Sequence, residues 1–141
     1  EFNKPYPNLM SSIISVAKGL KEKVLIYGED YSTCDGTGER DYIHICDLVD
    51  GHFAALEHLK NMKGYDVFNL GTGKSVSVKE LIKNFEDINK VKIPYEVTDR
   101  RLGDIPTCYA DPSKAKKDLK WVTKHNLNDM CRDSWEPVKG I

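Results

Sequence analysis

Short apolar runs that stop at glycine, separated by longer segments of helical periodicity, most limit the folds open to this chain. Val24–Tyr27 is an apolar run that ends at Gly28, and such a run is typical of a buried strand. Tyr65–Leu70 is a second predicted strand, closed by a Gly-Thr-Gly turn at positions 71–73. Strand-like and helix-like segments are intermixed along the chain. We therefore expect an α/β fold.

Further segments complete this pattern. Apolar residues recur at helical spacing in Asn8–Lys18, Asp47–Lys60, Ser77–Ile88, Ser113–Leu119 and Asn126–Trp135. Ser77 with Glu80 three residues later is a capping box, which predicts that a helix begins there. Tyr42–Ile45 and Val91–Val97 are predicted strands, the latter at a sheet edge because it contains Pro94.

Composition restricts the partners of the protein. The chain has 141 residues, of which 40% are hydrophobic and 30% charged, and this balance suits one folded domain. The net charge of -1 provides no general attraction to nucleic acid or to an anionic membrane, so we expect neither as a partner. Apolar runs are also too short to cross a bilayer. Any bound anion must be held by local groups.

The 4 cysteines are widely spaced, without a pair or rhythm typical of zinc ligands. Free thiols in a reducing compartment are therefore predicted, and the cytoplasm is the simplest location. Glu1 and Phe2 resemble a cloning remnant, and no Met precedes them. We expect residues 3–141 to be one domain cut from a longer protein.

Two known nucleotide-binding sequence patterns each lack a glycine that they require. The turn in "NLGTGKSVS" resembles a phosphate-binding loop, but that pattern needs glycine where Phe68 stands. The dinucleotide-binding pattern needs glycine where Val76 stands. His52 and His58 are six residues apart, which places them on different faces of a helix, so no metal site is expected. No convincing Ser/His/Asp set is present either.

Arg40 is the first candidate binding residue. It follows the turn Asp35-Gly36-Thr37-Gly38 in "TCDGTGERDYIHICD" and precedes a predicted strand. A guanidinium anchored there can bind a phosphate through two hydrogen bonds. The alternative is an ion pair with a nearby aspartate that braces the loop, and the residues alone favour neither.

The second candidate lies in "RRLGDIPTCY", Arg100–Tyr109, which is predicted to be a loop. Its arginines can close over an anion, while Asp104 can accept hydrogen bonds from hydroxyl groups. The alternative is a solvated surface turn, which is the usual setting of adjacent arginines.

The chain resembles the C-terminal half of the UDP-glucose 4-epimerases, which belong to the extended short-chain dehydrogenase/reductase family. Four blocks carry the resemblance in order, from about Pro7 to Trp135: "PNLM", "VLIYGEDYSTCDGTGERDYIHICDLVDGH", "VFNLGTGKSVSVKELI" and "RRLGDIPTCYADPSKAKKDLKW". The second block is specific. The resemblance implies a substrate-binding part of mixed short strands and helices, without the Rossmann half.

The resemblance also implies roles for particular residues in binding a UDP-sugar. They are Asn8 and Leu9 at a helix start beside the diphosphate, Leu25, Ile26 and Tyr27 around uracil, Arg40 and Arg101 on the diphosphate, Asp104 on a ribose hydroxyl, and Cys108 at the sugar end. Cys108 occupies a position where a small residue is associated with room for an N-acetyl group. Acceptance of UDP-GlcNAc and UDP-GalNAc is therefore expected beside UDP-glucose and UDP-galactose.

Some family features are missing from the chain. It has no Gly-x-x-Gly-x-x-Gly for NAD and no Tyr-x-x-x-Lys, so we expect no catalytic and no cofactor-binding residue here. The resemblance places NAD and the proton-handling groups in the N-terminal half, and predicts that the fragment alone is inactive. Segments around Tyr42–Ile45 and Val67–Leu70 would pack against that half and leave apolar faces without it. The family is often homodimeric, through helices of the absent half.

Other readings remain open. One is a non-catalytic nucleotide-binding module. Another is part of a related NAD-dependent nucleotide-sugar dehydratase or decarboxylase. The chain departs from the usual family pattern at Pro7, where asparagine is common, at Ser11, where proline is common, and at Leu102, where glutamate is common.

Overall fold

The computed structural model describes residues 8–60 and 63–140, so Glu1, Phe2 and Pro7 lie outside the described residues. The elements in chain order are α1 Leu9–Ala17, β1 Val24–Tyr27, β2 Glu39–Arg40, α2 Ile45–Leu59, β3 Val76–Ser77, α3 Val78–Asn89, β4 Tyr95–Thr98, β5 Thr107–Cys108, the π-helix η1 Ala115–Leu119 and α4 Leu127–Trp135. The expected α/β class of short strands and helices is confirmed.

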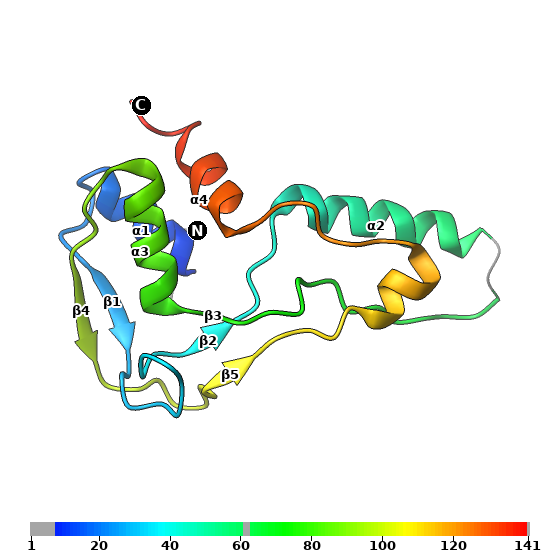
Figure 1. Ribbon diagram of the computed structural model, residues 1–141, viewed down its shortest axis with the longest axis horizontal. Coiled ribbons are helices and arrows are strands. Elements are labelled where there is room, and N and C mark those ends of the chain that lie inside the picture. The colour runs from blue at the N-terminus through cyan, green and yellow to red at the C-terminus, as the bar shows by residue number, and fades with distance from the viewer. Residues whose placement is uncertain (1–7, 61–62, 141) are drawn as a thin grey trace.

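The strands form two small sheets. β1 pairs in parallel with β4, and in the other sheet β2 lies between β3, which is antiparallel to it, and β5, which is parallel. Figure 1 shows an elongated molecule in which α1, α3, α4 and the β1–β4 sheet gather at one end. α2 and η1 lie at the other end, and the sheet of β2, β3 and β5 lies between them (Figure 1).

The buried core lies at the end that contains α3. This helix places Leu81, Ile82 and Phe85, each at most 2% exposed, on one face against α1, β1 and α4. The rest of the cluster is Ile13, Val16, Val24, Ile26, Ile93 and Cys131. Burial raises the pKa of the Cys131 thiol to about 11, and all four cysteines are unpaired, as predicted.

Local capping signals are confirmed. The Ser77 hydroxyl accepts a hydrogen bond from the Glu80 N–H at 3.0 Å, and the Glu80 carboxylate accepts one from the Ser77 N–H at 3.4 Å. α4 has the same arrangement between Asn126 and Asp129. Both helices therefore begin where their own sequences satisfy the free N–H groups.

Two predicted strands are wrong. Tyr42–Ile45 forms no strand, because pairing in β2 stops at Arg40 and His44 caps α2, its Nδ1 accepting a hydrogen bond from the Cys46 N–H at 3.1 Å. Tyr65–Leu70 is not a strand either. Both sides of β2 are already taken by β3 and β5, so β2 offers this segment no edge to pair with.

Two further boundaries differ from expectation. The predicted strand Val91–Val97 is replaced by β4, which begins after Pro94 because proline has no N–H to donate. β4 pairs with β1 as an edge of a two-stranded sheet. The predicted loop Arg100–Tyr109 contains β5.

One face of α2 is apolar and open to solvent. Ile45, Val49, Phe53, Leu56 and Leu59 recur at helical spacing and are 43–65% exposed. The apolar face expected near Tyr42–Ile45 is therefore present. Among residues 8–60 and 63–140, no helix combines the length and the apolar character that crossing a membrane requires.

Asp47 joins α2 to the segment before α4. Its side chain is 1% exposed and accepts hydrogen bonds from the N–H groups of Lys124 and His125, at 3.1 and 3.0 Å, and from His125 Nδ1 at 2.8 Å. The Trp121 indole donates to the Asp47 carbonyl at 3.0 Å, and the ring of His125 stacks on His44 at 4.2 Å. Burial alone would raise the pKa of the Asp47 carboxyl, but these hydrogen bonds outweigh it and lower that pKa.

We predict that Asp47→Asn lowers the free energy of unfolding by about 1–3 kcal/mol at pH 7, because a buried acceptor of several hydrogen bonds loses its charge. The folded-state pKa is depressed, so this stabilisation is complete above the ordinary carboxyl pKa of about 3.9 and is lost as the pH falls through the folded value. Urea unfolding from pH 3 to 7 measures it. Asp87→Asn, on the exposed side of α3, is the control. A difference from wild type that stays constant down to pH 3 would contradict the prediction.

Candidate functional site

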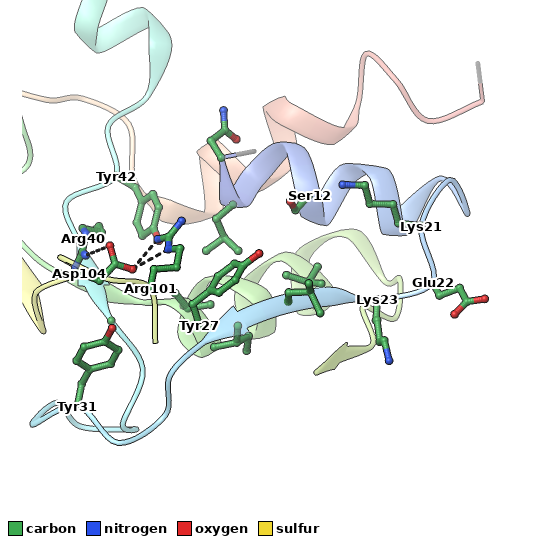
Figure 2. A pocket seen from close by; sticks show the side chains of 17 residues that line it. Ser12, Lys21, Glu22, Lys23, Tyr27, Tyr31, Arg40, Tyr42, Arg101 and Asp104 are labelled. Carbon is green, nitrogen blue, oxygen red and sulfur yellow. Dashed lines mark hydrogen bonds and ion pairs between the residues drawn. The ribbon is translucent and has the colours of Figure 1, made fainter. Parts of the chain in front are cut away.

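A cavity of about 830 Å³ lies between α1, β1 and the loops that follow β1 and β4. All the predicted binding residues except Cys108 line it: Asn8, Leu9, Leu25, Ile26, Tyr27, Arg40, Arg101 and Asp104. Figure 2 shows the side chain of Tyr27 coming from β1, that of Arg40 from β2, and those of Arg101 and Asp104 from the loop after β4. The fold thus brings together residues that are far apart in the sequence.

α1 contributes its N-terminus to the cavity. Asn8 caps this helix by accepting a hydrogen bond from the Ser11 N–H at 2.8 Å, and Leu9 and Ser12 line the cavity beside it. The N–H groups at a helix start carry a partial positive charge, which favours an anion nearby. This end of the cavity therefore suits a phosphate electrostatically.

β1 supplies an apolar wall through strand alternation. Val24 and Ile26 are 1% exposed and belong to the core, whereas Leu25 is 45% exposed and Tyr27 is half-buried. Successive side chains of a strand point to opposite faces. Of the three residues predicted here, Leu25 and Tyr27 offer side chains, and Ile26 contributes mainly backbone and support.

Arg40 lies between two carboxylates that brace neighbouring segments. Glu39 accepts hydrogen bonds from the hydroxyls of Ser75 and Thr107, at 2.9 and 3.2 Å. Asp41 accepts from the N–H groups of Thr72 and Gly73, both at 3.0 Å. Because side chains alternate along β2, Glu39 and Asp41 point into the structure while Arg40 points to the cavity.

The turn before β2 requires a glycine. Gly36 has φ +80°, and a Cβ there would lie 2.0 Å from the Glu29 carbonyl oxygen. Asp35 closes the turn by accepting hydrogen bonds from the N–H and hydroxyl of Thr37, at 2.9 and 2.6 Å, and from the Ser77 hydroxyl. This short turn leads directly into β2 and thereby fixes the position of Arg40.

Asp104 lies between two arginines (Figure 2). Arg101 donates to it through Nε at 2.9 Å, and its Nη2 is 2.8 Å from the same carboxylate oxygen. Arg40 Nη2 is 3.9 Å from the other oxygen, and Arg40 Nη1 donates to the Ile105 carbonyl at 3.0 Å. The ion pair with an aspartate, which was one alternative for Arg40, is therefore present at long range. The short contact to Asp104 is made by Arg101.

The ion pairs between Asp104 and the two arginines are weak enough for an anionic ligand to replace them. The three side chains are 25–36% exposed, and ion pairs at such surfaces contribute only about 0–1 kcal/mol. A hydrogen bond from an arginine to a bound anion contributes about 1.5–3 kcal/mol. An anionic ligand can therefore take the arginines from Asp104 and leave its carboxylate to accept hydroxyl groups.

The two adjacent arginines have different partners. Arg100 donates to the Asp30 carboxylate at 2.6 Å and to the Asp30 carbonyl at 2.5 Å, whereas Arg101 faces the cavity. Leu102 between Arg101 and Asp104 is fully exposed. The loop is thus a surface turn on one side and part of the cavity wall on the other.

Cys108 lines a second cavity of about 420 Å³, together with Arg40, Asp41, Asn69, Leu70, Tyr109, Ala110 and Asp111. Arg40 is the residue that both cavities share. Cys108 is exposed and lies opposite Arg40 in the β2–β5 pairing. The position expected at the sugar end is therefore separate from the main cavity and adjoins it at Arg40.

Some lining residues were not predicted. Tyr42 lines the main cavity, and its burial raises the pKa of its hydroxyl to about 12 against the opposing effect of Arg40. Its place two residues after Arg40 was a usable signal, because that spacing puts both on one side of an extended chain. Tyr31, Lys21 and Lys23 line the cavity without any comparable local signal.

The glycine-rich turn at 71–73 does not offer a phosphate cradle. The N–H groups of Thr72 and Gly73 already donate to Asp41, so they are not directed at a ligand. This geometry does not fit NAD. In the described part of the chain, no group of three or more His, Cys, Asp and Glu is placed to hold a metal ion.

Comparisons with known proteins agree with this architecture. Residues 3–134 match the family described as GDP-mannose 4,6 dehydratase, and the chain belongs to that family. The chain is also 52% identical, over 128 residues, to a UDP-glucose 4-epimerase from Bacillus subtilis. That match covers 91% of this chain but 38% of the relative, so the chain spans well under half the length of the protein it matches.

Solved structures give the same result. A UDP-glucose 4-epimerase from Stenotrophomonas maltophila, with bound NAD and formylated UDP-arabinopyranose, matches with a TM-score of 0.90 and 45% identity. One from Bifidobacterium longum, in complex with NAD+ and UDP, matches with a TM-score of 0.87 and 44% identity. Each match covers 96% of this chain and 41% of the solved chain. The chain therefore has the fold of one part of these enzymes.

Proposed function

We propose that this chain is the UDP-sugar-binding part of an NAD-dependent UDP-glucose 4-epimerase. The main support is that Arg40, Arg101 and Asp104 line one cavity, which the N-terminus of α1 also lines. Arginine forks and a helix start are groups that bind a diphosphate. The relative from Bifidobacterium longum was solved with UDP, which supports the same ligand here.

Different residues of the two cavities suit the uracil, the ribose, the diphosphate and the sugar of the nucleotide. The exposed side chain of Leu25 and the half-buried ring of Tyr27 suit the flat face of uracil. Arg40 and Arg101 face the diphosphate. Asp104, once released from them, accepts a hydrogen bond from a ribose hydroxyl. The sugar then extends past Arg40 into the cavity of Cys108.

The chemical step requires groups from outside this chain. NAD supplies the hydride chemistry when bound, and the relatives of known structure were solved with it. In the parent protein NAD is held by a preceding domain that also contains the proton-handling residues. The residues described here bind and orient the nucleotide, so the chain alone is inactive.

The exposed apolar face of α2 is where we place that preceding domain. Ile45, Val49, Phe53, Leu56 and Leu59 form a continuous apolar stripe, which is larger than isolated surface residues would account for. The relatives contain more than half of their length beyond the region that this chain matches. Docking of the NAD-binding domain on α2 would bury the stripe.

Two alternatives are distinguished by direct tests. A product assay on the full-length protein separates 4-epimerisation from dehydration or decarboxylation of a nucleotide sugar. A non-catalytic nucleotide-binding module would lack the NAD-binding glycines and the Tyr-x-x-x-Lys in the upstream sequence. A role in galactose metabolism, a cytosolic location and a homodimeric parent stay predictions.

The sugar specificity follows from Cys108. Its side chain is small and exposed, and it borders the cavity of about 420 Å³ into which the sugar would extend. We propose that this space admits an N-acetyl group, so that UDP-GlcNAc and UDP-GalNAc are accepted in addition to UDP-glucose and UDP-galactose.

We predict that Arg40→Ala in the full-length protein weakens UDP binding by about 10- to 100-fold, because charge-assisted hydrogen bonds to the diphosphate are lost. Isothermal titration calorimetry measures this. Arg132→Ala, which removes a half-exposed arginine on α4, is the matched control and should leave the affinity unchanged. An Arg40→Ala variant that binds UDP as tightly as wild type would refute the assignment.

We predict that Cys108→Tyr in the full-length protein selectively reduces epimerisation of N-acetylated UDP-sugars, because a bulky ring fills the second cavity. kcat/KM for UDP-GalNAc should fall at least about tenfold, while that for UDP-galactose changes little, since a steric clash of this size costs more than 1.4 kcal/mol. Cys108→Ser is the size-matched control. Equal losses on both substrates, or none, would contradict the prediction.

A further inference from the structure

Tyr31 carries a buried hydroxyl group at the wall of the main cavity. The residue is 5% exposed and lines the main cavity. Its Oη is shielded from solvent and has no hydrogen-bond partner among the described residues. A buried hydroxyl without a partner is costly, because it gives up hydrogen bonds to water and gains none. Such a group in a cavity wall can donate a hydrogen bond to a ligand or to an ordered water.

The ring of Tyr31 is held rigidly from two sides. The guanidinium of Arg100 lies over the ring at 4.1 Å from its centroid, and Asp30 holds that arginine at 2.6 Å. On the backbone side, a Cβ at Gly28 would lie 2.8 Å from Tyr31 Cε2 and 2.7 Å from Arg100 Cγ. Gly28 has φ +84°, so glycine is required both by conformation and by this close packing.

The backbone of Tyr31 is tied to the turn that positions Arg40. The Tyr31 N–H donates to the Gly36 carbonyl at 2.9 Å, and the Thr33 hydroxyl donates to the Thr37 carbonyl at 2.7 Å. Figure 2 shows the hydroxyl end of Tyr31 directed toward the part of the cavity where Arg40 and Asp104 lie. One turn thus fixes both the phenol and the guanidinium relative to the same ligand position.

We propose that Tyr31 is a ligand-binding residue, and that its hydroxyl donates a hydrogen bond to an oxygen of the nucleotide diphosphate held by Arg40 and Arg101. The inference rests on the proposed binding of a nucleoside diphosphate at this site. The nearby arginines draw negative charge to this end, and a phenol is a good donor to an anionic oxygen. Since Arg100 and Gly28 hold the ring in place, the hydroxyl needs little ordering when the ligand binds.

The adjacent residues Arg100 and Arg101 then have different roles. Arg100 lies over Tyr31, and Arg101 lies over the ring of Tyr27 with its guanidinium carbon 4.8 Å from the centroid. Arg100 does not face the cavity, so it acts on the ligand through Tyr31 and is a positioning residue. Arg101 reaches the ligand itself.

The test is Tyr31→Phe in the full-length protein, with Tyr95→Phe as the matched control because Tyr95 is 47% exposed on β4. Binding of UDP and of uridine is measured by calorimetry, and thermal unfolding is measured without ligand. We expect UDP affinity to fall about tenfold or more in Tyr31→Phe, with uridine affinity unchanged. The melting temperature should stay equal or rise, since no protein hydrogen bond is removed. Tyr95→Phe should change none of these.

Several results would overturn the inference. UDP affinity equal to wild type would mean that the hydroxyl does not contact the ligand. Equal losses for UDP and uridine would place the contact on the nucleoside and not on the diphosphate. A clear fall in melting temperature would show a structural partner for the hydroxyl. If wild type binds no UDP at all, the proposed function fails together with this inference, whereas the other results refute Tyr31 alone.

Discussion

The site depends on the carboxylates that flank Arg40. Glu39 and Asp41 each accept hydrogen bonds from neighbouring segments, and together they tie β2 to the chain around Ser75, Thr72 and Thr107. Because side chains alternate along a strand, bracing the residues on one side of β2 leaves Arg40 directed to the other side. The acidic residues next to this arginine are therefore mainly structural, and their position decides where the guanidinium lies.

A second constraint is that the cations are already partly neutralised. Asp104 binds Arg101 closely and Arg40 at longer range, which lowers the cost of gathering two like charges at one end of the cavity. The same exposed cluster contributes little to stability, so a diphosphate can replace the carboxylate as partner. Arg40 also borders both cavities and therefore lies between the nucleotide and the group attached to it.

Features encoded locally could be predicted from the sequence. α1, α3 and α4 follow from apolar spacing and from capping residues within a few positions. Tyr42–Ile45 and Tyr65–Leu70 were mispredicted because a strand exists only where a partner is free to pair. Eight residues of the main cavity were predicted through the family resemblance, whereas Cys108 lies in the adjoining cavity. Tyr31 was missed because its environment comes from Arg100, far away in the sequence.

We propose that Arg40 and Arg101 hold a nucleotide diphosphate in the space they now share with Asp104. A crystal structure of the full-length protein with bound UDP tests it most directly. We expect phosphoryl oxygens about 2.7–2.9 Å from nitrogens of both guanidinium groups, with the Asp104 carboxylate turned to a ribose hydroxyl. A diphosphate bound elsewhere, with Arg40 still donating to the Ile105 carbonyl and Arg101 still paired with Asp104, would contradict it.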